Sequence, residues 1–177
     1  MNISFYQKSF SAFIFSCILL FASICFAEIE TTVEPFTGAK TYTSKYMFSD
    51  NNHSMHTISL VRVVTPAENQ KTQIETYFLL NFNLPQNATL GDSMEIQVTP
   101  RHINSLPLTP LVIKGAGYSS VPTFRTGHKE LPPMTVTALE KGGELLVRVN
   151  FKPKGYDLYT IPADIVKEWA EVLKIVE

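Results

Sequence analysis

Cysteine is almost absent from this 177-residue chain, because Cys17 and Cys25 are its only two and both lie within the first 27 residues. Residues 28–177 therefore contain no thiol. This absence excludes disulfide stapling, a thioredoxin-like redox motif, a cysteine nucleophile and a thiolate metal site in that part. A chain of this length can fold without such aids, because a domain of about 150 residues buries roughly 70 % of its unfolded surface.

Charge and signature motifs are also sparse. Charged residues make up 18 % of the chain, and the formal net charge is -1. This balance argues against a nucleic-acid partner, and a hydrophobic content of 45 % excludes intrinsic disorder. The sequence has no His-Glu-x-x-His, no phosphate loop, no complete Gly-x-Ser-x-Gly elbow and no internal repeat. No cofactor is therefore expected.

Glycine and proline are both missing from residues 1–27, which have the layout of a secretory signal peptide. A single cation, Lys8, precedes an uncharged apolar run that ends in Cys25-Phe26-Ala27. The run is about 16 residues long, short of the roughly 20 that a membrane-spanning helix needs. We therefore predict cleavage after Ala27, which leaves residues 28–177 as a single exported domain without a membrane span. The style of the signal and the lack of disulfides favour a bacterial protein that is periplasmic or secreted.

All 11 prolines and 8 glycines fall in residues 28–177 and divide them into short segments, which favours strands. Met94–Thr99 and Glu144–Phe151 alternate apolar and polar residues with the period of a half-buried strand. On these patterns we predict strands at 40–48, 58–64, 74–82, 94–99, 134–139, 144–151 and 156–160. Lys141-Gly142-Gly143 is predicted to form a hairpin turn between two of them.

One helix is predicted, over residues 162–176. Pro162 suits its first position, and Ile165, Trp169, Val172 and Val176 form one apolar stripe along it. The predicted fold is mainly β: an antiparallel sandwich of about seven or eight strands with this C-terminal helix packed on it. A single curved sheet with the helix across it is the alternative. Residues 100–133 hold six prolines and are predicted to be an irregular loop region, because structureless loops of this length are uncommon unless they are functional. Short edge strands within it, such as Leu111-Val112-Ile113, are the alternative.

This loop region is also where positive charge gathers. Between Glu95 and Glu130 there is no acid, and four cations give a formal charge of +4. Arginine forks match carboxylate and phosphate geometry. The region is therefore a candidate site for an anionic ligand or surface, or a solvated loop whose charges pair elsewhere. The residues proposed for it are Arg101, His102, Lys114, Tyr118, Arg125, His128 and Lys129.

A second candidate is a copper or zinc site formed by His53, Met55 and His56, which offer soft and borderline ligands within four positions. A surface turn with two histidines is the alternative interpretation. No serine, histidine and carboxylate pattern identifies a nucleophile, so no catalytic residue is proposed.

The sequence thus favours a non-enzymatic binding or envelope-accessory protein, whose partner is an anionic ligand, an envelope surface or another envelope protein. The alternatives are a secreted hydrolase with a site assembled from distant positions, a weak copper- or zinc-binding protein, and a structural subunit.

Overall fold

The computed structural model describes residues 28–49, 54–66, 72–84, 88–111, 123–127, 130–153 and 155–176. The predicted signal peptide, residues 1–27, lies outside these ranges. The described elements are β1 (Glu30–Val33), β2 (Lys40–Ser49), β3 (Met55–Thr65), β4 (Gln73–Phe82), β5 (Thr89–Thr99), β6 (His102–Leu111), β7 (Thr123–Thr126), α2 (Pro133–Glu140), β8 (Leu145–Lys152), β9 (Gly155–Ile161) and α3 (Ala163–Lys174).

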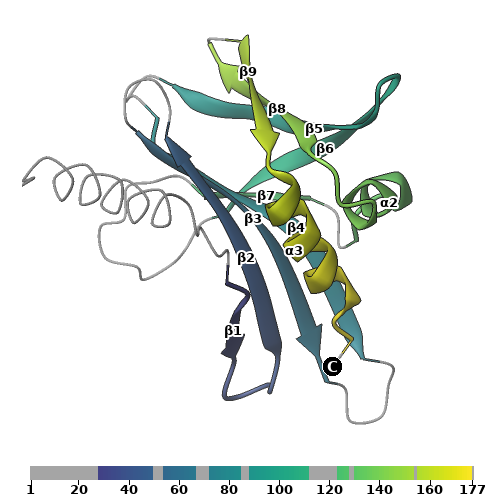
Figure 1. Cartoon of the computed structure of the whole chain (residues 1–177). Helices are drawn as coiled ribbons and strands as arrows, with labels where there is room; N and C mark the ends of the chain where they lie inside the picture. Colours follow the sequence, from purple (N-terminus) through teal and green to yellow (C-terminus); the bar gives the residue numbers. More distant parts are fainter. Residues whose placement is uncertain are drawn as a thin grey trace, which may run out of the picture.

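The nine described strands form one antiparallel sheet in the order β1-β2-β3-β4-β7-β6-β5-β8-β9. The sheet curls into a half-barrel, and α3 lies against its concave side (Figure 1). The chain is thus mainly β, as predicted, but a single curled sheet replaces the sandwich that we put first. The structure also has more strands than expected, and a second helix.

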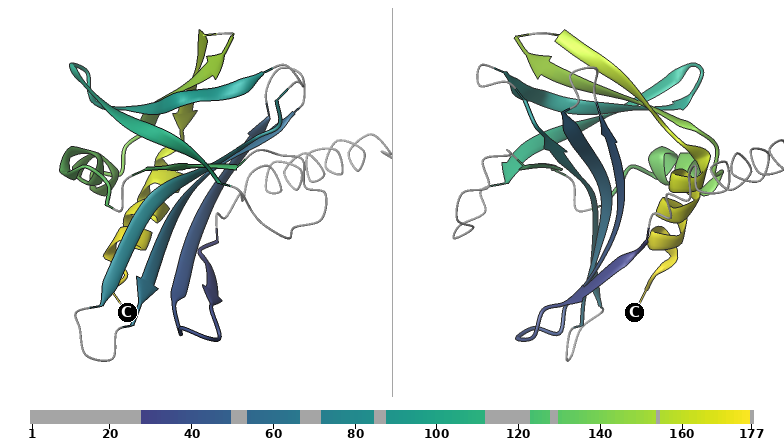
Figure 2. Two further views of the ribbon diagram at one scale, coloured as in Figure 1. Left: turned by 180° about the vertical axis from the view of Figure 1, so that it is seen from behind. Right: turned by 60° about the vertical axis from the view of Figure 1, so that its left-hand side comes forward.

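The core lies between the concave face of the sheet and α3 (Figure 2). Alternate residues of β3 and β4 point inward, so that Ile58, Leu60, Phe78 and Leu80 are fully buried. Trp169 of α3 packs edge-on against Phe78, with 5.3 Å between ring centroids. The helix therefore supplies the side chains that fill the open side of the half-barrel.

The predicted C-terminal helix is confirmed, although it runs from Ala163 to Lys174. Ile165, Trp169 and Val172 of the predicted stripe are buried, whereas Val176 lies beyond the helix and is 63 % exposed. Within the described residues, no helix is both long enough and apolar enough to cross a membrane.

The strand predicted at residues 134–139 is wrong, because these residues belong to α2. Thr135, Val136 and Thr137 have high β propensity, but Pro133 occupies the first turn of a helix. The helix buries Thr135 and Leu139, four residues apart, against the sheet. Lys141-Gly142-Gly143 is consequently a helix-to-strand turn and not a hairpin.

The stretch predicted to be irregular contains two strands, β6 and β7. Two prolines fit within β6 because the strand changes partner along its length. It pairs with β5 as far as Pro107 and with β7 from Leu108 onward, so that each half has one open side. A proline, which has no N–H to donate, is tolerated on such an open side.

Candidate functional site

The residues proposed for an anion site do not come together where the structure describes them. Arg101 and His102 lie exposed at the β5–β6 turn. Arg125 lies in β7 opposite Thr109, seven residues along β6 from His102. At about 3.3 Å per residue, some 23 Å of strand separates the two places. Lys114, Tyr118, His128 and Lys129 lie outside the described residues.

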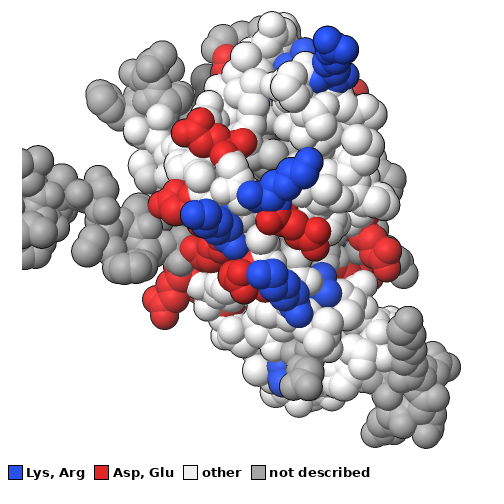
Figure 3. All heavy atoms as spheres, turned by 45° about the vertical axis from the view of Figure 1, so that its right-hand side comes forward, with Lys and Arg blue, Asp and Glu red and all other residues white. Residues whose placement is uncertain are grey.

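Arg125 already has partners on the convex face of the sheet. Its guanidinium carbon lies 4.4 Å from the centroid of the Tyr77 ring, and its Nη2 lies 3.8 Å from Glu75 Oε2. Burial raises the pKa of Tyr77, and the nearby Arg125 lowers it by less. On the face shown in Figure 3, cationic and anionic side chains are interspersed, with no broad area of one sign.

The candidate metal ligands Met55 and His56 point to opposite faces of β3. Met55 is 57 % exposed, whereas His56 is 3 % exposed on the concave side. The His56 ring stacks on Phe82, with centroids 4.8 Å apart, and contacts Phe48. Two neighbours on one strand with opposite directions do not share an ion. His53 lies outside the described residues, and the described part of the chain holds no cluster of three metal-ligating His, Cys, Asp or Glu side chains.

A pocket of about 250 Å³ opens between the sheet and both helices. Its apolar walls come from β4, the segment before α2, α2 itself and the last turn of α3: Ile74, Leu131, Val136 and Leu173. Arg62 of β3 and Thr76 of β4 provide polar groups, and the carboxylates of Glu130 and Glu140 are exposed at the rim. The pocket thus combines an apolar floor with one half-buried cation, as small-molecule sites commonly do.

Two hydrogen bonds orient Arg62. Its Nε donates to the backbone carbonyl oxygen of Ile175 at 2.6 Å, and its Nη1 donates to Thr76 Oγ1 at 2.9 Å. The first bond satisfies a carbonyl at the end of α3, where the helix dipole favours a cation. Within the described residues, Nη2 has no protein partner.

The charge of Arg62 is incompletely compensated. Burial lowers the pKa of its guanidinium, and the Glu130 carboxylate raises it by less. A partly desolvated cation of this kind gains from an anion that reaches its free N–H groups. Arg62 therefore fastens the C-terminal helix to the sheet and also presents donors to the pocket.

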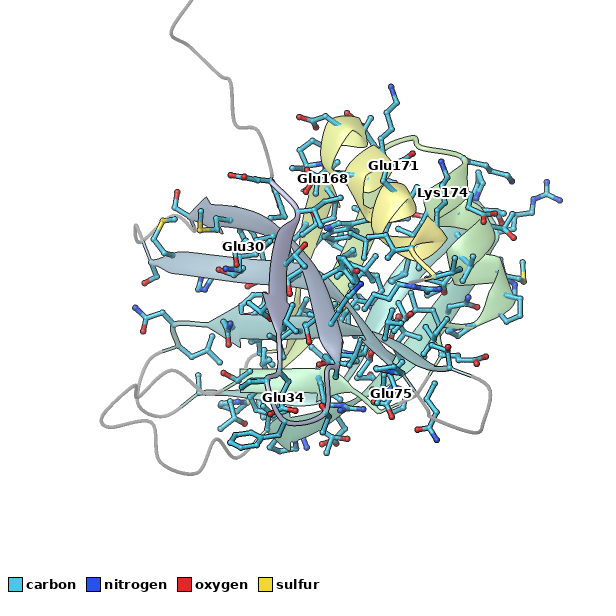
Figure 4. All side chains as sticks on the ribbon, turned by 90° about the horizontal axis from the view of Figure 1, so that it is seen from below. Glu30, Glu34, Glu75, Glu168, Glu171 and Lys174 are labelled. Carbon is cyan, nitrogen blue, oxygen red and sulfur yellow. The ribbon has the colours of Figure 1, made fainter. Side chains whose placement is uncertain are left out.

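A second polar group lies under α3, at Ser44 of β2. Ser44 is fully buried, and Figure 4 shows Glu168 on the part of α3 next to β1 and β2. Burial raises the pKa of the Glu168 carboxyl, Ser44 Oγ lowers it by less, and Asp164 one turn earlier raises it further. The approach of Ser44 falls short of hydrogen-bond geometry, and Ser44 Oγ, Glu168 Oε1 and Trp169 Nε1 are buried without a partner in the described part of the chain.

Sequence reasoning missed Arg62 because it treated residues 58–64 as apolar on both faces. The signal was present, since a single arginine between Val61 and Val63 in an apolar strand must find partners when the strand is buried. The pocket itself could not be found, because α2 was predicted to be a strand.

No protein-family model, no curated protein and no solved structure matches this chain.

Proposed function

We propose that this chain is an exported, non-enzymatic binding protein that holds a small carboxylate-bearing amphiphile in the Arg62 pocket. In this proposal the carboxylate binds the free side of the guanidinium, and the apolar part of the ligand lies on the floor formed by Leu131, Val136 and Leu173. The single observation that carries the proposal is a half-buried arginine, incompletely compensated, that lines a pocket with an apolar floor and a charged rim.

The size and rim of the pocket narrow the ligand class. A space of about 250 Å³ is slightly below the usual size of ligand pockets, about 300–1,000 Å³, and fits a molecule of amino-acid or short fatty-acid size. Glu130 and Glu140 at the rim would attract an amino group. A zwitterion with an apolar side chain, which carries both charges, therefore matches the pocket better than a plain anion does.

Export is part of the same proposal. Residues 1–27 would direct the chain out of the cytoplasm and be removed after Ala27. The remaining domain, without cysteine, would act in the bacterial periplasm or outside the cell. Its stability would come from the core under α3, without disulfide bonds.

Thermal unfolding with three probes of similar size tests this function: hexanoate, norleucine and hexylamine. We expect norleucine and hexanoate to raise the melting temperature. Hexylamine should leave it nearly unchanged, because the exposed carboxylates of Glu130 and Glu140 add little binding free energy without a contact to Arg62. At 100 times its dissociation constant, a ligand adds about 2.7 kcal/mol to the free energy of unfolding. Stabilisation by hexylamine alone, or by none of the three, would count against the carboxylate proposal.

Two variants locate the site. Arg62→Met removes the donors, but it also removes the bond to Ile175 and lowers stability. Val136→Phe leaves Arg62 intact and fills the pocket from α2. Both should abolish the ligand-induced shift, and Arg101→Met, at the distant β5–β6 turn, is the matched control that should keep it. Loss of the ligand-induced melting shift in Arg101→Met alone would contradict the Arg62 site and indicate that the ligand binds the basic region between Glu95 and Glu130.

A further inference from the structure

The two outer edges of the sheet differ in how well they are protected. β1 is four residues long, and its Glu30 forms an ion pair with Lys45 of β2, with 2.6 Å between Nζ and Oε2. β9 is seven residues long and pairs with β8 in an unbroken register from Ile161 to Gly155. It contains no proline, lysine, arginine or bulge, and Asp157 on its concave side is the one charged side chain that could oppose pairing at this edge.

Two large side chains of β9, those of Tyr156 and Leu158, are exposed on the convex face beside the polar Thr160. Tyr156 is 56 % and Leu158 is 55 % exposed, and they alternate along the strand. The Arg148 guanidinium lies 5.0 Å from the centroid of the Tyr156 ring. Among the described residues, no strand pairs with the outer side of β9.

We propose that β9 is a dimerisation edge, and that its occupant is the β9 strand of a second copy of this chain in antiparallel pairing. Leu158 is the middle residue of Gly155–Ile161. A two-fold axis at Leu158 therefore pairs the whole strand with its copy, as an isologous interface requires. Leu158 then lies opposite Leu158 of the second copy, and Tyr156 opposite its Thr160.

The charges of the chain agree with this register. Asp157 is the only charged residue of β9, and the axis at Leu158 places it opposite Tyr159 of the second copy. An axis one residue earlier would set Asp157 against its own copy, which is unfavourable. The same register directs the β8–β9 turn toward the first turn of α3 in the second copy. Lys152 before this turn is paired with Asp92 of its own chain, so the turn brings no unpaired lysine of the described residues against the exposed Asp164.

Sedimentation equilibrium of the purified protein, expressed from the 177-residue sequence, tests the association. We expect a reversible dimer. Leu158→Lys should give a monomer with an unchanged far-UV circular dichroism spectrum. The matched control is Ile103→Lys, because Ile103 is 55 % exposed but lies on β6, away from the outer edge strand β9. This variant should remain a dimer.

Cysteine cross-linking tests the register, and the lack of thiols in residues 28–177 keeps its background low. Directly opposite Cα atoms in an antiparallel pair lie about 4.5–5.5 Å apart, within the range that a disulfide spans. With diamide as oxidant, Leu158→Cys should form a covalent dimer. Tyr156→Cys should do so only when Thr160→Cys is added, and Ile103→Cys should not.

A wild-type protein that is monomeric at all concentrations would overturn the proposal. A dimer that Leu158→Lys leaves intact, or cross-linking of Ile103→Cys as efficient as that of Leu158→Cys, would also overturn it.

Discussion

Replacement of Trp169 by alanine should lower the free energy of unfolding, because Trp169 is the side chain that packs α3 on Phe78 of the sheet. Trp169 is fully buried and contacts Phe78 with 5.3 Å between ring centroids. Truncation of a buried tryptophan to alanine costs about 3–5 kcal/mol. Natural domains have about 5–15 kcal/mol of stability, so that this loss is a large fraction of the total. At roughly 2–4 °C per kcal/mol for a domain of this size, the melting temperature should fall by about 6–20 °C.

Denaturant unfolding followed by far-UV circular dichroism measures this loss, because Trp169 is the only tryptophan and its fluorescence disappears with it. Trp169→Phe is the control. It keeps a ring against Phe78 and deletes an indole N–H that is buried without a partner in the described part of the chain. Relief of that unpaired donor offsets part of the lost volume, so we expect a cost of about 1 kcal/mol. A Trp169→Ala protein within about 1 kcal/mol of wild type would refute the reasoning that α3 completes the core.

Three further substitutions test other parts of the account. Gly91→Ala should lower the free energy of unfolding by about 1–3 kcal/mol in denaturant titration, because the added Cβ would lie 2.8 Å from Asn150 Cβ. Gly143→Ala is the control and should leave the stability unchanged, because nothing lies within 4 Å of its added Cβ. Arg148→Met should cost about 1–3 kcal/mol by the same assay, because it leaves the mostly buried Glu95 carboxylate without its ion-pair partner. Lys152→Met breaks an exposed pair with Asp92 and should cost less than about 1 kcal/mol. Equal costs for the two variants would contradict this ranking. Glu168→Gln should raise the melting temperature at pH 7 but not at pH 4. The pKa of Glu168 is raised above 4.5 in the folded state, so the folded protein binds more protons than the unfolded protein at pH values just above 4.5. The folded protein therefore becomes less stable as the pH rises and Glu168 ionises, and the neutral glutamine removes this loss. A melting difference that does not change with pH would contradict this assignment.

Much of the sheet could be predicted from local patterns. The alternation of Met94–Thr99 and Glu144–Phe151 and the apolar runs around Leu60 and Phe78 all lie in observed strands. The stripe of α3 was equally clear, because its period is set by contact with a single surface. These features depend on neighbours that are close in sequence.

The failures depend on contacts that are distant in sequence. Thr135 prefers a strand locally, yet the Asn104 side-chain N–H donates to its hydroxyl at 2.8 Å across the fold and α2 packs on the sheet. β6 was hidden by prolines whose open sides exist only once β5 and β7 are in place. The pocket could not be predicted for the same reason, because it forms only when α2 is a helix and the end of α3 lies beside Arg62.

The central claim, a carboxylate ligand in the Arg62 pocket, is tested most directly by NMR titration of the labelled protein with norleucine. We expect saturable shifts of the methyl signals of Leu131, Val136 and Leu173 and of the Arg62 Nε–H signal, with the signals of Arg101 and His102 unchanged. No shift at the pocket, or shifts confined to the β5–β6 turn, would contradict it.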